Sequence, residues 1–119
     1  MCGIVGLFIK NPALESELGA LVAPMLSEMT ERGPDSAGMA VYRDPNDKGC
    51  KVTVLSQTLD FDWASFEKAV NSHFSLNKFT VTQNHAVLSL DNSLSEVEHW
   101  LASNWTDLSV TSAGTNIEI

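Results

Sequence analysis

The first part of the chain combines a short apolar run with a longer periodic segment. Residues 4–9 are almost all apolar and include β-branched side chains, which predicts a strand buried on both faces. Asn11 follows as an N-cap with Pro12 at the first helical position, so a helix is expected to begin there. Its apolar residues recur at helical spacing and predict a buried core stripe made of Leu14, Leu18, Leu21, Val22, Met25, Leu26 and Met29.

Two prolines set the expected course of this helix. Pro24 lies inside the periodic segment and lacks the backbone donor of a helical turn, which predicts a kink or a break near Val22. Gly33 and Pro34 then predict the end of the helix, because glycine and proline are common at and just beyond helix C-termini.

Two further strands are expected in the middle of the chain, with a polar loop between them. Residues 37–42 predict a second buried strand, and residues 51–56 predict an alternating one. The polar residues 44–49 are typical of a hairpin loop that joins the two. A sheet is therefore expected to form around the N-terminal strand.

Two capped helices are expected in the second half. Asp62 can cap a helix whose apolar face carries Trp63, Phe66 and Val70. Ser93 and Glu96 form a capping box for a helix whose apolar face carries Leu94, Val97, Trp100 and Leu101.

Strands are expected between and after these helices. Residues 79–90 alternate over a length that predicts either one long strand or a hairpin turning at Gln83 and Asn84. Residues 112–119 predict the beginning of another strand. Because no repeat, low-complexity tract or linker interrupts the pattern, residues 1–119 are expected to form one folded unit, or part of one, of the α+β class.

Composition narrows the classes of partner. The 119 residues are 44% hydrophobic and 18% charged, values that suit a globular core in a chain of single-domain length. Seven Lys and Arg residues against fifteen Asp and Glu residues give a net charge of −8, and no basic cluster interrupts this acidic excess. Binding to nucleic acid or to an anionic membrane is therefore disfavoured.

No targeting segment is evident in the sequence. The longest apolar run, residues 3–9, is much shorter than the roughly 18 residues of a membrane span, and it lacks the charged n-region of a secretory signal. A cytoplasmic location is expected. In that reducing compartment Cys2 and Cys50 are expected to remain free thiols.

Cys2 occupies a position with unusual chemical potential. If Met1 is removed, Cys2 carries a thiol and an α-amine on the same Cα, so that one residue supplies a nucleophile and its base. The reference pKa of an α-amine, about 7.7 to 8.0, allows the free amine to take the thiol proton near neutral pH. The plainer interpretation is a small buried residue at the start of a strand.

A second candidate element lies between the first helix and the next strand. Residues 32–38 read Arg-Gly-Pro-Asp-Ser-Ala-Gly, a short loop with two glycines and a fixed positive charge. For the turn alone, Arg32 can compensate the dipole at the helix C-terminus and Gly33 can serve as a cap. That interpretation does not explain why the loop accompanies an N-terminal Met-Cys-Gly-Ile-Val-Gly sequence.

Residues 1–6 and 32–38 together resemble the opening of class II glutamine amidotransferase domains. These include the glutaminase domains of asparagine synthetase, amidophosphoribosyltransferase, glucosamine-phosphate synthase and glutamate synthase. The resemblance implies the N-terminal nucleophile hydrolase fold, with this chain as the N-terminal part of a four-layer αββα sandwich. Residues 32–43 are most similar to the stand-alone amidotransferase subunits of glutamate-synthase-like enzymes, including N-methylglutamate synthase.

The resemblance implies a role for three residues. Cys2 is the nucleophile, while Arg32 and Gly33 belong to a loop that packs over and orders the N-terminus. The reaction implied is hydrolysis of glutamine to glutamate and ammonia through a glutamyl thioester, with no cofactor and no metal. The ammonia passes to a synthase subunit or domain, and any flavin or iron–sulfur cluster belongs to that partner.

The chain also departs from the family pattern. The family uses a downstream Thr-Arg segment for the substrate carboxylate and an Asn-Gly segment for the oxyanion, and neither is present here. Asn92 only imitates the second, because Ser93 follows it. The chain is therefore expected to be the first part of a longer amidotransferase domain. The alternative is a degenerate, non-catalytic subunit that binds or regulates a synthase.

Other candidate sites are weaker. Three scattered histidines lack the spacing of a zinc site and are expected to be exposed or satisfied in the core: His73, His85 and His99. Residues 35–38 imitate a serine nucleophile elbow, but Pro34 stands where its first glycine is required. Acidic residues in loops and caps are expected to be solvated or capping: Asp44, Asp47, Asp60 and Asp62.

Overall fold

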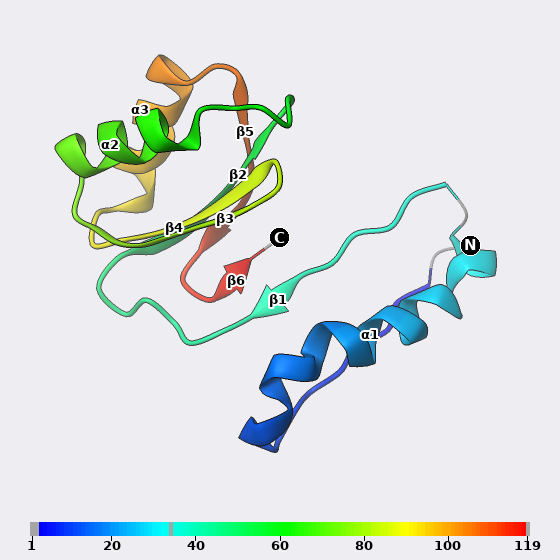
Figure 1. The fold of residues 1–119 in the computed structure, drawn as a ribbon. Coiled ribbons are helices and arrows are strands. Elements are labelled where there is room, and N and C mark those ends of the chain that lie inside the picture. The colour runs from blue at the N-terminus through cyan, green and yellow to red at the C-terminus, as the bar shows by residue number, and fades with distance from the viewer. Residues whose placement is uncertain (1–2, 34, 119) are drawn as a thin grey trace. The chain divides into compact units, whose positions relative to one another are not determined.

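The chain divides after Gly38 into two units, Met1–Gly38 and Met39–Ile119. The computed structural model describes residues 3–33 and 35–118 (Figure 1). The first unit is an extended segment followed by a helical path, and the second unit carries the main sheet with its helices.

The helical path of the first unit begins where the sequence predicts. It consists of the 3₁₀ helix η1 over Pro12–Glu17, the α-helix α1 over Leu18–Ser27 and the 3₁₀ helix η2 over Thr30–Arg32. Asn11 caps its start, because its Oδ1 accepts a hydrogen bond from the N–H of Ala13 at 3.1 Å. Gly33 ends the path and donates its N–H to the carbonyl of Thr30 at 3.3 Å.

Two expectations about this helix do not hold in full. Of the kink or break predicted near Val22, the break does not occur, because α1 runs through Pro24 to Ser27. The turn after the proline keeps its hydrogen bond, because the N–H of Glu28 donates to the carbonyl of Pro24 at 3.1 Å. No residue of α1 is buried, so the apolar stripe is half-buried to exposed and forms no core within its own unit.

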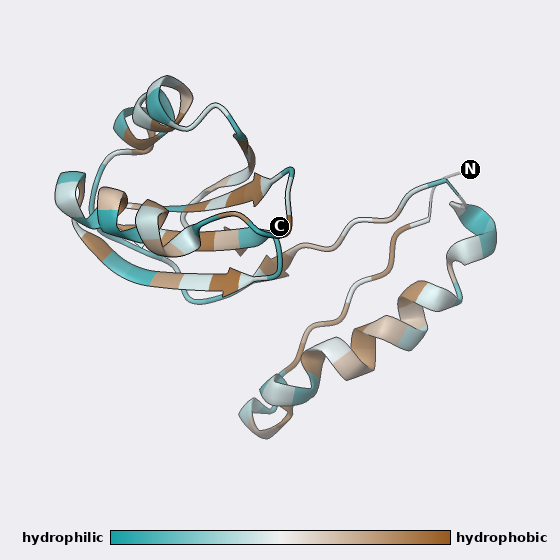
Figure 2. Cartoon of the chain, turned by 45° about the horizontal axis from the view of Figure 1, so that its top comes forward, coloured by the Kyte–Doolittle hydropathy of each residue, from teal (hydrophilic) through white to brown (hydrophobic). Residues whose placement is uncertain are grey.

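The apolar run at residues 4–9 is extended but forms no strand in the described residues. It lies alongside α1, and both segments carry apolar residues (Figure 1 and Figure 2). Ile4 is 95% exposed and Phe8 is 83% exposed. The predicted doubly buried strand is wrong because an apolar run indicates burial but does not itself provide the neighbouring strand that its backbone groups need.

The second unit contains a four-stranded antiparallel sheet of order β3-β4-β2-β5. In chain order its elements are β2 Cys50–Ser56, α2 Trp63–His73, β3 Leu76–Thr82, β4 His85–Leu90, α3 Leu94–Asn104 and β5 Leu108–Gly114. Both helices lie on one face of the sheet (Figure 1). The core lies between that face and the helices, where Phe66 and Val70 of α2 and Val97 and Leu101 of α3 are buried with Leu88 of β4.

β2 is buried on both faces, although its sequence predicts alternation. All its residues except Leu55 are buried, because β4 and β5 flank it on either side. Val52 and Val54 belong to the core, and Thr53 points to the opposite face by the strand's alternation. Thr53 is only 2% exposed there, and its Oγ1 accepts a hydrogen bond from the Oγ of Ser112 at 3.0 Å. A buried polar residue is thus satisfied across the sheet.

The predicted strand at residues 37–42 is much shorter than expected. Only Val41–Tyr42 forms a strand, β1, and it pairs antiparallel with β6, Ile117–Glu118. The predicted burial is also wrong, since Tyr42 is exposed. Because β2 pairs with β4 and β5, the loop at residues 44–49 is not a hairpin loop between neighbouring strands.

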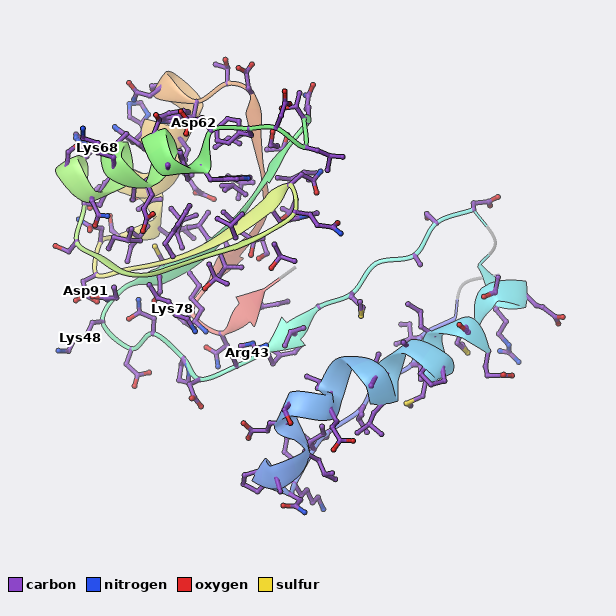
Figure 3. The ribbon with its side chains drawn as sticks, in the orientation of Figure 1. Arg43, Lys48, Asp62, Lys68, Lys78 and Asp91 are labelled. Carbon is purple, nitrogen blue, oxygen red and sulfur yellow. The ribbon has the colours of Figure 1, made fainter. Side chains whose placement is uncertain are left out.

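The local signals in the second unit are confirmed. Asp62 caps α2, with its Oδ2 accepting the hydroxyl of Ser65 at 2.6 Å and its Oδ1 accepting the same residue's N–H at 3.0 Å (Figure 3). These hydrogen bonds, that from the hydroxyl first, hold the pKa of the Asp62 carboxyl below its usual value. Ser93 and Glu96 form the predicted capping box of α3. β3 and β4 form a hairpin that turns at Gln83, whose φ is 55°.

Asn46 fastens the loop between β1 and β2 to the sheet. Its side-chain Nδ2 donates to the carbonyl of Leu90 at 2.8 Å, and it also lies within hydrogen-bond distance of the Ser89 Oγ at 3.1 Å and the Cys50 carbonyl at 3.3 Å. Its backbone N–H donates to the carbonyl of Thr115 at 2.9 Å. One residue therefore joins the ends of β2 and β4 to the segment after β5.

Replacing Asn46 by alanine is expected to lower the free energy of unfolding of the second unit by about 1 to 3 kcal/mol, because partly buried carbonyls lose their donor. Urea unfolding followed by tryptophan fluorescence measures this. Asn71→Ala, at an exposed position of α2, is the matched control and is expected to change the same quantity by less than about 0.5 kcal/mol. Equal midpoints for the two variants would show that Asn46 holds nothing together.

Candidate functional site

Cys2, the predicted nucleophile, lies outside the described residues. Gly3, which is bonded to it, is the first residue that the structure describes. The contacts of Gly3 are therefore the described contacts nearest in sequence to the predicted nucleophile.

Gly3 lies directly against the end of the helical path. A Cβ built on Gly3 would overlap the Cε of Met29, and it would lie 3.3 Å from the Cβ and 3.5 Å from the Cδ of Arg32. The absence of a side chain at position 3 is therefore what allows this close approach. The structure thus places Arg32, one of the predicted loop residues, against Gly3, the residue that follows Cys2 in the sequence.

A tight turn places Met29 and Arg32 on the same side. The N–H of Arg32 donates to the carbonyl of Met29 at 2.9 Å within the path through η2. The hydroxyl of Thr30 donates to the carbonyl of Ser27 at 2.7 Å and holds the start of this turn. Residues three apart face the same side of a 3₁₀ turn, so Met29 and Arg32 can both reach Gly3.

Gly33, the other predicted loop residue, ends the turn without needing glycine's conformational freedom. Its φ is −149°, which lies outside the left-handed region, and among the described residues a Cβ there would meet only the carbonyl oxygen of Ser36, at 3.9 Å. The described residues after it, 35–40, are exposed and belong to no strand or helix. Within the described part of the N-terminal segment, which begins at Gly3, the structure thus gives Arg32 a contact and gives Gly33 none.

Met29 is the residue in this arrangement that sequence reasoning missed. Its helical spacing predicts a member of the core stripe, whereas the structure places its thioether end against Gly3. The available signal was its position three residues before Arg32, which puts both side chains on one face of a helical turn.

Asn92, which imitates part of the oxyanion segment, has a different role in the structure. Its Oδ1 accepts the N–H of Ser75 at 2.9 Å, and the N–H of Asp91 donates to the carbonyl of Ser75 at 3.0 Å. These bonds tie the start of β3 to the end of β4. Asn92 also lines an open hollow of about 430 Å³. Lys48 and Asp91, both labelled in Figure 3, line it as well.

Cys50 lies at the edge of this hollow but is poorly suited to be a nucleophile. It is only 3% exposed and is a free thiol at the start of β2. Burial, and secondly the negative charge of Glu98, raise the pKa of the Cys50 thiol above its ordinary value. The thiolate, which is the reactive form, is therefore disfavoured at neutral pH.

The raised pKa of Cys50 predicts a loss of stability at alkaline pH. A group whose pKa is higher in the folded than in the unfolded state stabilises the fold fully below the unfolded value, about 8.5 for a thiol, and this contribution is lost as pH rises through the folded pKa. Unfolding free energies measured from pH 7 to pH 10.5 are expected to fall more steeply for the natural protein than for Cys50→Ala. Parallel curves would contradict the raised pKa.

All three histidines lie in the second unit. His73 stacks on Trp100 with ring centroids 5.5 Å apart and planes 19° apart, while His85 is half-buried in β4 and His99 is exposed on α3. Within residues 3–33 and 35–118, no cluster of His, Cys, Asp and Glu side chains is arranged to hold a metal ion. The helices in that part of the chain are also too short or too polar to span a membrane.

Two curated proteins are similar to this chain. The glutamine amidotransferase-like protein GlxB of Rhizobium meliloti (strain 1021) is 39% identical over 120 aligned positions, which cover 100% of this chain and 40% of GlxB. A Methanothermobacter thermautotrophicus (strain Delta H) protein, named "Putative glutamine amidotransferase", is 50% identical over 42 residues, or 35% of this chain and 13% of that protein. No protein-family model matches the chain, and no solved structure matches it significantly.

These similarities support a relationship to glutamine amidotransferases. The chain spans 40% of the length of GlxB, and the shared region with the second relative is shorter still. The compared regions therefore make up less than half of either relative.

Proposed function

We propose that the chain belongs to a class II glutamine amidotransferase, which hydrolyses glutamine and supplies ammonia to a synthase. The observation that carries the proposal is the similarity to GlxB along the whole chain, at 39% identity. Residues 1–6 and 32–38 add the expected nucleophile and loop sequences. The contact between Gly3 and Arg32 supports the same assignment, because it joins these two sequences in space.

The proposed reaction uses both functional groups of Cys2. After Met1 is removed, the free α-amine takes the thiol proton, and the thiolate attacks the carboxamide carbon of glutamine. The tetrahedral intermediate collapses, its nitrogen takes up the proton and leaves as ammonia, and a glutamyl thioester remains. Water then attacks the thioester, which releases glutamate and restores the thiol. One glutamine and one water thus give one glutamate and one ammonia.

Arg32 and Gly33 are proposed to order the N-terminus rather than to react. Arg32 places its aliphatic stem beside Gly3. The groups that hold the glutamine carboxylate and the oxyanion are proposed to lie outside residues 1–119, because the Thr-Arg and Asn-Gly segments are absent from these residues.

The proposed fold is the N-terminal portion of one four-layer αββα sandwich. The second unit already contains a helical layer on one face of an antiparallel sheet, and this is the composition of half of such a sandwich. Its other face carries Thr53 and Ser112, and the short β1 and β6 pair begins a second sheet in the same unit. The observed α+β architecture is consistent with this arrangement.

The proposed context is cytoplasmic nitrogen metabolism. The ammonia acceptor is a synthase subunit or domain of the glutamate-synthase-like type, and a flavin in that partner would do chemistry that this chain does not perform. The glutaminase step itself needs no cofactor and no metal. Neither nucleic acid nor a membrane is a proposed partner, since the net charge of −8 opposes binding to either polyanionic surface.

Glutamate release from glutamine by the complete protein with its partner tests the proposal. Conversion of glutamine is expected, and asparagine, which is one methylene shorter, is the control substrate and is expected to react far more slowly. The alternative is a non-catalytic subunit that binds or regulates a synthase, favoured by the absence of both downstream segments from these residues. A stable complex with the synthase that lacks glutamine hydrolysis would favour that alternative.

A further inference from the structure

The contact between Met29 and Gly3 has no role in the function as proposed so far. The Cε of Met29 occupies the volume that a Cβ of residue 3 would need. The Cβ and Cδ of Arg32 stand 3.3 Å and 3.5 Å from that same point. Residue 3 is therefore packed against two side chains, and we call this arrangement the Gly3 seat.

Both side chains of the Gly3 seat come from one short stretch of ordered backbone. The N–H of Met29 donates to the carbonyl of Leu26 at 3.0 Å, and its carbonyl accepts the N–H of Arg32 at 2.9 Å. Met29 is half-buried, so the protein limits the space open to its flexible side chain. The spacing of the two side chains is set by this turn rather than by the exposed loop that follows it.

We propose that Met29 is a positioning residue for the N-terminal nucleophile, an inference that rests on the proposed function of Cys2. The thiol and the α-amine of Cys2 share one Cα, so rotation of the backbone between residues 2 and 3 moves both groups together. Packing Gly3 against Met29 and Arg32 restricts the backbone of the residue that is bonded to Cys2. Catalysis is sensitive to such placement, because an error of about 1 Å at a reacting group can cost about a hundredfold in rate.

Methionine suits this position for a physical reason. Its unbranched side chain ends in a methyl group beyond a polarisable sulfur, and it adapts to irregular spaces. Leucine has a similar volume but ends one bond closer to its own backbone, so it fills the surroundings without reaching residue 3 in the same way. Replacing Met29 by leucine therefore shortens the reach of the side chain toward residue 3 while nearly keeping its volume.

The test compares Met29→Leu, Met29→Ala, Gly3→Ala and the double variant Gly3→Ala/Met29→Ala in the complete protein with its partner. Met29→Leu is expected to unfold near the natural temperature, because substitutions that conserve volume are well tolerated. Its kcat for glutamine is expected to fall about tenfold with KM unchanged, because Met29 touches Gly3, the neighbour of the nucleophile, and has no proposed contact with the substrate. Met25→Leu, the same substitution one turn earlier in α1, is the matched control and should keep the natural kcat.

The double variant tests the contact itself. Gly3→Ala adds a methyl group where the Cε of Met29 lies, and Met29→Ala vacates that space. The double variant is therefore expected to have a higher kcat than Gly3→Ala alone and a higher unfolding temperature than the sum of the single changes allows. A double variant no better than Gly3→Ala, or a natural kcat in both Met29→Leu and Met29→Ala, would overturn the positioning role.

Failure of the proposed function would look different. If the Cys2→Ala variant still hydrolyses glutamine, Cys2 is not the nucleophile. Met29 would then have no nucleophile to position. The unfolding temperatures would still report whether residues 3 and 29 are in contact, because they do not depend on activity. A different outcome would refute the role of Met29 alone. In that case Cys2→Ala abolishes glutamine hydrolysis, which supports the proposed function, while Met29→Leu and Met29→Ala leave hydrolysis at its natural rate.

Discussion

Replacing Cys2 by alanine is expected to abolish glutamine-dependent product formation by the complete enzyme with its synthase, while ammonia-dependent formation continues. The substitution removes the thiol that attacks glutamine and leaves the acceptor chemistry in the partner untouched. Loss of a covalent nucleophile is expected to lower the glutaminase rate by about 10⁴-fold or more. Product formation measured in parallel with glutamine and with an ammonium salt separates the two activities.

Cys50→Ala is the matched control for this experiment. Cys50 is a buried thiol of the second unit, and its removal is expected to leave both activities near their natural levels. Equal loss of the glutamine and ammonia activities in a folded, assembled Cys2→Ala enzyme would contradict the proposed division of labour. Cys2 would then support the partner or the assembly instead of the first chemical step.

Residues 1–119 expressed alone are expected not to hydrolyse glutamine at the rate of a complete amidotransferase, even with Met1 removed. Glutamine must be held by its α-carboxylate and α-amine, and the developing oxyanion needs fixed donors. Loss of one oxyanion donor alone costs about 100- to 1,000-fold in rate, so loss of the substrate clamp as well leaves only background hydrolysis. A glutaminase assay on purified, monodisperse material measures this.

The isolated chain is also expected to aggregate or to pack loosely. Ile4 and Phe8 are almost fully exposed, and the stripe along α1 has no buried member. Exposed apolar surface of this kind favours self-association. Robust turnover by monodisperse 1–119 that disappears in its Cys2→Ala variant would show instead that these residues already contain the missing groups, with Asn92 the first to examine.

The elements that could be predicted are those stabilised by interactions between residues close together in the sequence. Asn11, Asp62 and Ser93 each cap a helix with hydrogen bonds to residues two or three positions away, so the sequence pattern contains the whole interaction. The turn at Gln83 was likewise one of two alternatives given by an alternating segment. Local signals of this kind correctly predicted α2 and α3, and the hairpin between them is one of the two alternatives that they allowed.

The wrong predictions concern partners that lie far away in sequence. The pairing of Val41–Tyr42 with Ile117–Glu118 joins residues more than seventy positions apart, and no local pattern specifies it. The run at residues 4–9 has the composition of a buried strand, yet within its unit it lies alongside α1 without strand pairing. Burial and pairing depend on what surrounds an element, and periodicity does not encode those surroundings.

The candidate site was predictable only in part for a related reason. Arg32 is identified by the residues around it and by the resemblance they carry, and the structure places it beside Gly3. Met29 has the spacing of an ordinary core residue, so its contact with Gly3 emerges only when the extended segment and the helical path are placed together. A contact between two elements cannot be read from the pattern of either one.

The role of Cys2 as nucleophile is tested most directly by mapping where a glutamine-mimicking electrophile reacts. The complete protein is treated with a glutamine analogue that carries a diazoketone in place of the carboxamide, and intact-mass measurement and peptide mapping then locate the adduct. We expect a mature chain that begins at Cys2, with one adduct on Cys2 and none on the buried Cys50. A retained Met1, or an adduct confined to Cys50, would contradict it, because a blocked α-amine cannot serve as the base.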